Sequence, residues 1–186
     1  MGRRCGEGEA SLLLIMDTSR RFKILFLCTG NSARSIFAEY LLRKIAPAQF
    51  EVFSAGASPK SKPHPLAIQV LHEMYDVDAS DARCKSWDEF KAVPFDFVVT
   101  LCDSARELCP VWPGQPILAH WGSPDPAESG GALDEQARLF WQVAQQICRR
   151  VELFALLPFA KLDALRLAVA TRDIGDRELL RLPQSL

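Results

Sequence analysis

Residues 22–35 read Phe-Lys-Ile-Leu-Phe-Leu-Cys-Thr-Gly-Asn-Ser-Ala-Arg-Ser. The apolar run over 22–27 is typical of a strand buried in a parallel sheet, and the Gly-Asn pair behind it indicates a turn. Apolar residues then recur at helical spacing as far as Pro47, so we expect a helix that begins at Ser32 or Ala33. A strand, a short loop and a helix in this order indicate the first unit of an α/β domain.

The rest of the chain repeats this alternation. Apolar, β-branched and aromatic runs predict further strands at residues 50–55, 95–101 and 116–119. Helical periodicity predicts helices at residues 63–74 and 133–157, and a further helix and tail at 159–170 and 174–182. We therefore expect a single α/β domain, with a four-stranded parallel sheet flanked by helices, at residues 21–157, between a flexible arm at 1–20 and a C-terminal helical extension at 158–186.

The composition excludes several classes of protein. The 186 residues carry a net charge of −1, from 22 basic and 23 acidic side chains, so nucleic acid is not an expected partner. No apolar stretch approaches the roughly 18 residues that a membrane span needs, so no membrane partner is expected. The apolar run at 12–16 is too short for a signal-peptide core and follows Glu7 and Glu9, so we expect a cytoplasmic protein. Its six cysteines are then expected to be thiols.

The loop after the first strand has the pattern Cys-x5-Arg, from Cys28 to Arg34. Gly30 and Asn31 tolerate left-handed backbone angles, so successive N–H groups can point inward and bind an anion. The next helix adds the positive end of its dipole, and Arg34 offers a two-pronged guanidinium. The residues predicted to bind an oxyanion are Thr29, Gly30, Asn31, Ser32, Ala33 and Arg34.

Cys28 lies at the base of this positive field, where we expect a stabilised thiolate and hence a nucleophile. Ser35 can donate a hydrogen bond to that thiolate. The lysine-bearing nucleotide loop GxxxxGK[ST] is absent, so no ATP site is expected. The alternative interpretation is that Cys28 is a small buried hydrophobic residue at the end of a strand.

Two further cysteines, Cys102 and Cys109, follow the predicted third strand, and Pro110 comes directly after them. Asp103 or Ser104 is expected to cap a short helix between them. Residues seven apart in a helix are separated by about 10 Å along its axis, whereas a disulfide needs Cα atoms within roughly 7 Å. The pair can close only if the helix unwinds, which favours a redox switch. Half of a zinc site and two unrelated core cysteines are the alternatives, and no metal is assigned because a second Cys/His pair is missing.

The loop after the fourth predicted strand contains Asp125, which Pro126 holds in an extended conformation. A parallel sheet brings this loop to the same edge as Cys28, where a carboxyl can act as general acid for a leaving oxygen. An ordinary Asp-Pro turn is the alternative. His120 and Trp121 are expected to pack or to anchor the loop. No role is assigned to Cys5, Cys84 and Cys148.

Together, the Cys28–Ser35 loop, Asp125-Pro126 and the α/β order resemble the low-molecular-weight protein tyrosine phosphatase superfamily. Within it, the chain is similar to the arsenate reductases that share this fold, over about residues 22–157. The segments that carry this second resemblance are Cys102-x6-Cys109-Pro110, His120-Trp121-Gly122 and Asp125-Pro126-Ala127.

The resemblance implies a reaction for the first residues of the site. Cys28 would attack arsenic(V) held by the loop and Arg34, with phosphate as a competing anion. Asn31 would shape the loop, Ser35 would assist the thiolate, and Asp125 would protonate the departing hydroxyl.

The resemblance also implies a relay of cysteines. Cys102 would attack Cys28 and release arsenite, and Cys109 would then attack Cys102 and free Cys28. Thioredoxin, or a glutaredoxin with glutathione, would reduce the final disulfide, so no bound cofactor is expected.

Two other functions stay open. A phosphatase acting on phosphomonoesters needs Cys28, Arg34 and Asp125 alone. Phosphatases of this fold usually place an aromatic residue after Asp-Pro, where this chain has Ala127, and often a second cysteine where it has Ala33. Both departures favour the reductase. The third hypothesis is an oxyanion-binding module without catalysis.

Overall fold

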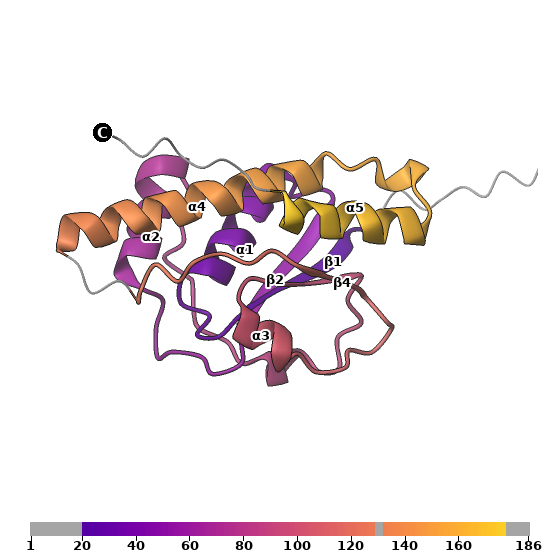
Figure 1. Cartoon of the computed structure of the whole chain (residues 1–186), viewed down its shortest axis with the longest axis horizontal. Helices are drawn as coiled ribbons and strands as arrows, with labels where there is room; N and C mark the ends of the chain where they lie inside the picture. The colour runs from indigo at the N-terminus through magenta and orange to yellow at the C-terminus, as the bar shows by residue number, and fades with distance from the viewer. Residues whose placement is uncertain (1–19, 129–131, 178–186) are drawn as a thin grey trace, which may run out of the picture.

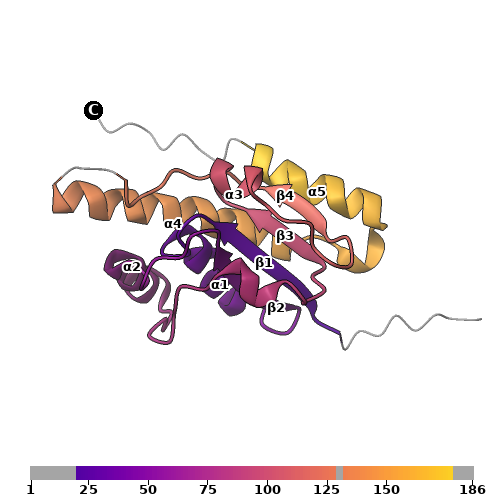
Figure 2. The ribbon, with the colours of Figure 1, turned by 90° about the horizontal axis from the view of Figure 1, so that it is seen from below.

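The computed structural model describes residues 20–128 and 132–177. In these ranges four parallel strands form one sheet (Figure 1), and Figure 2 shows their order, β2-β1-β3-β4. The strands are β1 (Phe22–Cys28), β2 (Phe50–Gly56), β3 (Phe97–Thr100) and β4 (Ile117–His120). The predicted α/β class and the four-stranded parallel sheet are confirmed.

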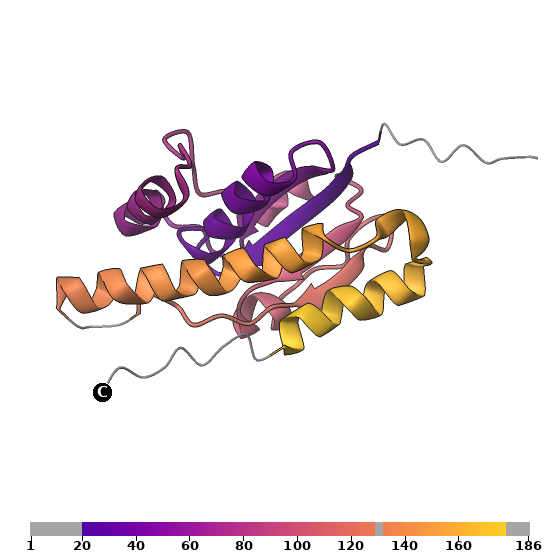
Figure 3. The same cartoon turned by 90° about the horizontal axis from the view of Figure 1, so that it is seen from above.

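The helices cover the sheet. The α-helices are α1 (Arg34–Ile45), α2 (Pro65–Tyr75), α3 (Asp103–Glu107), α4 (Leu133–Ala155) and α5 (Ala164–Asp176), and the 3₁₀ helices are η1 (Trp87–Phe90) and η2 (Phe159–Lys161). Helix α1 packs against β1, β2 and α4, whereas α5 packs against β4 and α4. Figure 3 shows α4 and α5 side by side over the sheet. Seen from below, α3 lies at the end of β3 (Figure 2).

The register of the strands determines where a site can form. Leu27 pairs with Thr100 of β3, and Thr100 pairs with His120 of β4. On the other side of β1, Cys28 pairs with Gly56 at the end of β2. All four strands therefore end at the same edge, and the loops that follow them meet there, as is usual for ligand sites of open α/β sheets.

An aromatic cluster forms the core beneath α4. The rings of Phe50, Phe97, Trp121 and Phe154 are almost completely buried, and Phe159 of η2 closes the cluster. Phe154 contacts each of the other four rings, with centroid distances between 5.1 and 5.7 Å. Tilted and edge-to-face packing of this kind adds to the burial of apolar area, so the end of α4 is held to the sheet by rings.

The tail differs from the expected pair of segments at 159–170 and 174–182. Helix α5 is one continuous helix through the expected break, because Thr171 is completely buried and its hydroxyl donates to the Leu167 carbonyl at 2.7 Å. Tertiary packing has therefore overridden the weak helix propensity at this point. Residues 1–19 of the expected arm and 178–186 of the expected extension lie outside the described residues.

No helix within residues 20–128 and 132–177 is long and apolar enough to cross a membrane.

Phe154→Ala should lower the free energy of unfolding by about 3–5 kcal/mol. The substitution removes a fully buried ring and leaves a cavity among the surrounding aromatic side chains. Equilibrium unfolding in urea measures the change. Leu156→Ala is the control, because Leu156 follows the same helix and is 80% exposed, and it should change stability by less than about 0.5 kcal/mol. Equal effects of the two substitutions would contradict this account of the core.

Candidate active site

The loop from Cys28 to Ser35 turns at Asn31, whose φ of 47° lies in the left-handed region, while Gly30 keeps a negative φ. The Asn31 side-chain amide donates to the Ser35 and Ser54 hydroxyls, both at 2.8 Å. Its carbonyl accepts the backbone N–H of Lys85 at 2.7 Å. All three hydrogen bonds are buried, so Asn31 holds the loop to α1, to β2 and to the segment before η1.

The outer side of the loop is closed by the segment after β2. The backbone N–H groups of Ala57, Ser58 and Lys60 donate in turn to the carbonyls of Cys28, Thr29 and Gly30, at 3.2, 2.9 and 2.9 Å. Because these carbonyls point outward, the loop presents its N–H groups to the interior, the arrangement that binds anions.

Gly56 is required for this close approach. A Cβ atom at Gly56 would lie 2.6 Å from the Thr29 carbonyl oxygen and 2.9 Å from the Asn31 nitrogen. A larger residue would therefore displace the loop from the end of β2.

Cys28 is almost completely buried at the base of the loop. Its sulfur lies 3.0 Å from the Ser35 hydroxyl, and the Asn31 N–H donates to it at 3.2 Å. The N-terminus of α1 begins at Arg34, so its dipole adds a positive potential at the same place. These contacts fix the position of the sulfur at the base of the loop.

Arg34 and Asp125 meet above Cys28. Their side chains form an ion pair, and a second Arg34 nitrogen donates to the Ser123 carbonyl at 3.2 Å. Arg34 is buried, whereas the Asp125 side chain is 25% exposed. The loop after β4 thus brings a carboxyl directly to the oxyanion loop, 91 residues away in the chain.

Cys102 lies beside the same loop, with its sulfur 3.3 Å from the Thr29 hydroxyl. It is the N-cap residue of α3 and makes no side-chain cap hydrogen bond. The expectation that Asp103 or Ser104 caps this helix is wrong, because the helix begins at Asp103 and its N-cap residue is Cys102.

Cys109 lies apart from Cys28 and Cys102. It follows the other end of α3, is half-buried, and lines a different cavity from Cys28 and Cys102. Burial raises the pKa of its thiol, and Trp112 offsets only part of this effect. The structure therefore brings Cys102 to Cys28 but leaves Cys109 apart, and all three are thiols.

A cavity of about 390 Å³ opens above the loop. It is lined by Cys28, Thr29, Gly30, Ser32, Ala33, Arg34, Lys60, Cys102, Asp103, Ser104, Asp125, Ala127 and Glu128. Asn31, predicted to bind an oxyanion, is fully buried behind the loop and does not line the cavity. Its role is to shape the loop.

Sequence reasoning missed Lys60, which adds a cation to the cavity. The signal was present, because Lys60 and Lys62 follow the second strand, and in a parallel sheet the end of that strand lies beside the end of the first.

Sequence reasoning also missed a buried ionic network behind the Cys28–Ser35 loop. Glu39 of α1 is 2% exposed and pairs with Lys85 at 3.0 Å and with Arg43. The Ser54 hydroxyl, which binds Asn31, donates to the same carboxylate. A glutamate four residues after Ser35, on the buried face of a helix, was the available signal.

The loop that carries Asp125 is held from behind by Arg150 of α4. One Arg150 nitrogen donates to the Trp121 carbonyl, the Gly122 carbonyl and the Ser123 hydroxyl, at 2.8, 2.9 and 3.0 Å. The guanidinium is 4% exposed, and burial lowers its pKa. A buried cation of this kind fixes the loop, because a single guanidinium nitrogen binds three of its oxygens.

Trp121 anchors the loop to α5. Its indole N–H donates to the Thr171 carbonyl at 2.9 Å, and the ring is fully buried. Gly175 of α5 packs so closely that a Cβ there would lie 1.9 Å from the His120 carbonyl oxygen. Helix α5 therefore supports the loop that brings Asp125 to Arg34.

The other cysteines within the described residues lie outside the cavity. Burial raises the pKa of Cys84, and burial together with Glu152 raises that of Cys148 to about 11. Cys5 lies outside the described residues.

With this geometry established, comparison with known proteins defines the class. The chain matches the low molecular weight phosphotyrosine protein phosphatase family over residues 23–164. It belongs to this family.

The individual proteins to which the chain is similar include a narrower class, the arsenate reductases. The chain is 39% identical to an arsenate reductase of Oceanobacillus iheyensis over 132 residues, which cover 71% of this chain and 94% of the relative. A solved structure of an arsenate reductase in the phosphate binding state superimposes with a TM-score of 0.62 at 30% identity, covering 72% of this chain and 96% of that one. The thioredoxin-dependent arsenate reductase of Corynebacterium glutamicum superimposes with a TM-score of 0.51 at 30% identity, covering 73% of this chain and 64% of that one.

Lys85→Met should lower the free energy of unfolding by about 3 kcal/mol, because it removes one of the two cations that pair with the buried Glu39 carboxylate. Urea unfolding measures the loss. Lys91→Met breaks only an exposed pair with Asp88 and should cost less than about 1 kcal/mol. If both variants unfold at the same urea concentration, the network does not stabilise the loop.

Proposed function

We propose that this protein reduces arsenate to arsenite, with Cys28 as nucleophile and with Cys102 and Cys109 as the thiols that supply electrons. The observation that carries the proposal is the position of Cys102. Its sulfur lines the same cavity as Cys28, above an anion-binding loop. Hydrolysis of a phosphomonoester has no use for a second thiol there, whereas reduction requires one.

Arsenate binding begins with an exchange of partners at Arg34. Without ligand, the guanidinium pairs with Asp125. An oxyanion in the loop accepts the backbone N–H groups and the Arg34 fork, and Lys60 adds a further positive charge. Asp125 is then free to take up a proton, which it needs in order to act as an acid.

In the first covalent step, the Cys28 thiolate attacks arsenic(V) and an oxygen leaves. Asp125 donates a proton to that oxygen, so that water departs and a Cys28–arsenic bond remains. The short contacts from Ser35 and Asn31 position the sulfur for this attack.

In the second step, the Cys102 thiolate attacks the Cys28 sulfur. The electron pair of the sulfur–arsenic bond passes to arsenic, which leaves as arsenite, and a Cys28–Cys102 disulfide forms. The Thr29 hydroxyl beside Cys102 can stabilise the attacking thiolate.

In the third step, Cys109 attacks the Cys102 sulfur and Cys28 leaves as a thiolate. Helix α3 must unwind, since it lies between the two cysteines, and residues seven positions apart along a helix are separated by about 10 Å. The helix has five residues and lacks a side-chain cap, so unwinding costs little.

A thiol reductant then restores the Cys102 and Cys109 thiols. A thioredoxin-type partner is supported by the similarity to the thioredoxin-dependent enzyme of C. glutamicum, and a glutaredoxin with glutathione is the other donor expected. Such reductants are available in the cytoplasm, where we place the reaction. Phosphate should compete with arsenate, since the similar arsenate reductase structure is in the phosphate binding state.

Hydrolysis of phosphomonoesters is the second candidate, favoured by the Arg34–Asp125 pair over Cys28. Ala127 argues against it as the main activity. This residue lines the cavity next to the Asp-Pro pair and offers no ring on which a phenyl group could stack.

Substitution of each of the three cysteines should stop the reaction at a different step. Cys28→Ser should abolish arsenate reduction, because an alcohol at this position cannot form the disulfide. Cys102→Ser should retain arsenic on Cys28. Cys109→Ser should release one arsenite per chain and stop as a Cys28–Cys102 disulfide. Intact mass and arsenite release over repeated turnovers distinguish these products.

Cys148→Ala provides the control, because this thiol lies in α4 away from the cavity, and it should reduce arsenate at nearly the rate of the unchanged protein. The relay is wrong if Cys109→Ser continues to reduce arsenate over many turnovers with thioredoxin as the donor.

A further inference from the structure

Two buried arginines meet at Ser123, the residue two positions before Asp125. The side chain of Arg34 donates to the Ser123 carbonyl at 3.2 Å, and the side chain of Arg150 donates to the Ser123 hydroxyl at 3.0 Å. Arg34 and Arg150 are only 7% and 4% exposed. Because Arg34 closes the oxyanion loop and Arg150 lies in α4, Ser123 joins the anion site to the long helix behind it.

Arg150 is a buried cation whose hydrogen-bond partners are neutral. Its Nη1 donates to three oxygens of the loop after β4, and its Nη2 donates to the Gly175 carbonyl of α5 at 3.3 Å. None of the ion pairs within the described part of the chain includes Arg150. A charge that is not neutralised acts over a longer distance in a protein interior than in water, so this guanidinium contributes positive potential to its surroundings.

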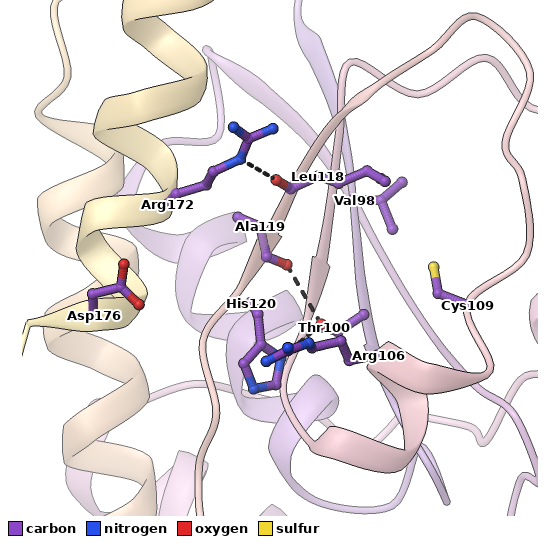
Figure 4. A pocket seen from close by; sticks show the side chains of 9 residues that line it. All are labelled: Val98, Thr100, Arg106, Cys109, Leu118, Ala119, His120, Arg172 and Asp176. Atoms are coloured by element: carbon purple, nitrogen blue, oxygen red, sulfur yellow. Dashed lines mark hydrogen bonds between the residues drawn. The ribbon is translucent and has the colours of Figure 1, made fainter.

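The C-terminal end of α5 stabilises this cation. The Gly175 carbonyl lies in the last turn of the helix, where carbonyls lack a partner within the helix and the helix dipole is negative. Glycine permits the approach, since a Cβ at this position would lie 1.9 Å from the His120 carbonyl oxygen. The helix is itself fixed on β4, because Nε of Arg172 donates to the Leu118 carbonyl at 3.1 Å (Figure 4).

Helix α5 is an addition to the family domain. The match to the family ends at residue 164, which is the first residue of α5. The support that Gly175 gives to Arg150 therefore comes from a part of the chain that the family does not define.

We propose that Arg150 is a positioning residue for oxyanion binding. Through Ser123 it fixes the guanidinium of Arg34, and its own charge adds to the positive potential that attracts the anion. The proposal rests on the proposed function in one respect, that an oxyanion occupies the Cys28–Ser35 loop, and it applies to phosphate as it does to arsenate.

The contact with Ser123 matters most when the anion enters. In the proposed reaction, Arg34 exchanges the Asp125 carboxylate for the oxyanion, and the Ser123 carbonyl is the partner that it keeps. Arg150 holds the backbone on that side, so the carbonyl stays in place during the exchange. The Arg34 fork is then oriented for a two-pronged contact with the anion.

Binding of inorganic phosphate to the reduced chain tests the proposal without any redox step. Isothermal titration calorimetry gives the dissociation constant, and far-UV circular dichroism establishes that each variant is folded at the temperature used. The dissociation constant should rise about tenfold in Arg150→Met, because the Arg34 fork loses its support and the site loses a buried positive charge.

Two variants separate position from net charge. Arg149→Met is the matched control, because Arg149 is the adjacent residue of α4, is exposed, and takes away the same charge. Its phosphate dissociation constant should change less than about twofold, as expected for a screened surface charge. Arg150→Lys keeps a cation and a donor at the buried position, and it should bind phosphate more tightly than Arg150→Met.

Ser123→Ala carries the test if Arg150→Met does not fold. This substitution removes the hydroxyl that Arg150 binds and keeps the backbone carbonyl that Arg34 binds. The phosphate dissociation constant should rise by about two- to threefold, since one of the contacts that fix the loop is lost.

An unchanged phosphate affinity in Arg150→Met, or in Ser123→Ala where it carries the test, overturns the proposal and leaves the arsenate reaction standing. Equal losses in Arg150→Met and Arg149→Met also overturn it, because net charge alone then explains the effect. So does an Arg150→Lys that binds phosphate no better than Arg150→Met. If the unchanged chain does not bind phosphate, the oxyanion loop and the proposed function fail with it.

Discussion

The site depends on one constraint, the left-handed turn at Asn31 and the three buried hydrogen bonds of its side chain. These bonds join the oxyanion loop to α1, to β2 and to Lys85, while the Asn31 N–H donates to the Cys28 sulfur. Two of these three partners are themselves fixed, since Ser54 and Lys85 both contact the buried Glu39 carboxylate. A shift of this one residue would therefore move the nucleophile, the loop amides and the helix dipole together.

The positive charge of Arg34 has a different partner in the free protein and in the proposed complex with an oxyanion. Without ligand, Asp125 provides the negative partner for Arg34. In the proposed reaction, a bound oxyanion would take over that position and release the carboxyl. In that reaction, Arg34 would couple anion binding to the release of Asp125 as the acid. Arg150 and α5 keep the Asp125 loop in reach of this exchange, which gives the C-terminal helix a part in the site.

Most of the fold and much of the site followed from local sequence patterns. The 22–35 stretch predicted a strand, an anion loop and a helix because strand burial, turn chemistry and helix periodicity agree there. The parallel sheet placed Asp125 near Cys28 without any knowledge of contacts. What sequence could not supply was long-range packing. Helix α5 continues through Thr171 because Trp121 packs on it. The N-cap of α3 is Cys102, one residue before the capping residues that the sequence suggested.

The central claim is that arsenate draws two electrons from the thiols of this chain. Titration of free thiols before and after arsenate, followed by mapping of disulfides, tests it most directly. Of the six cysteines, two should lose their thiols with arsenate and none with phosphate, and the product should be a Cys102–Cys109 disulfide with Cys28 free. An unchanged thiol count after arsenate, with arsenate bound in the loop, would contradict the account.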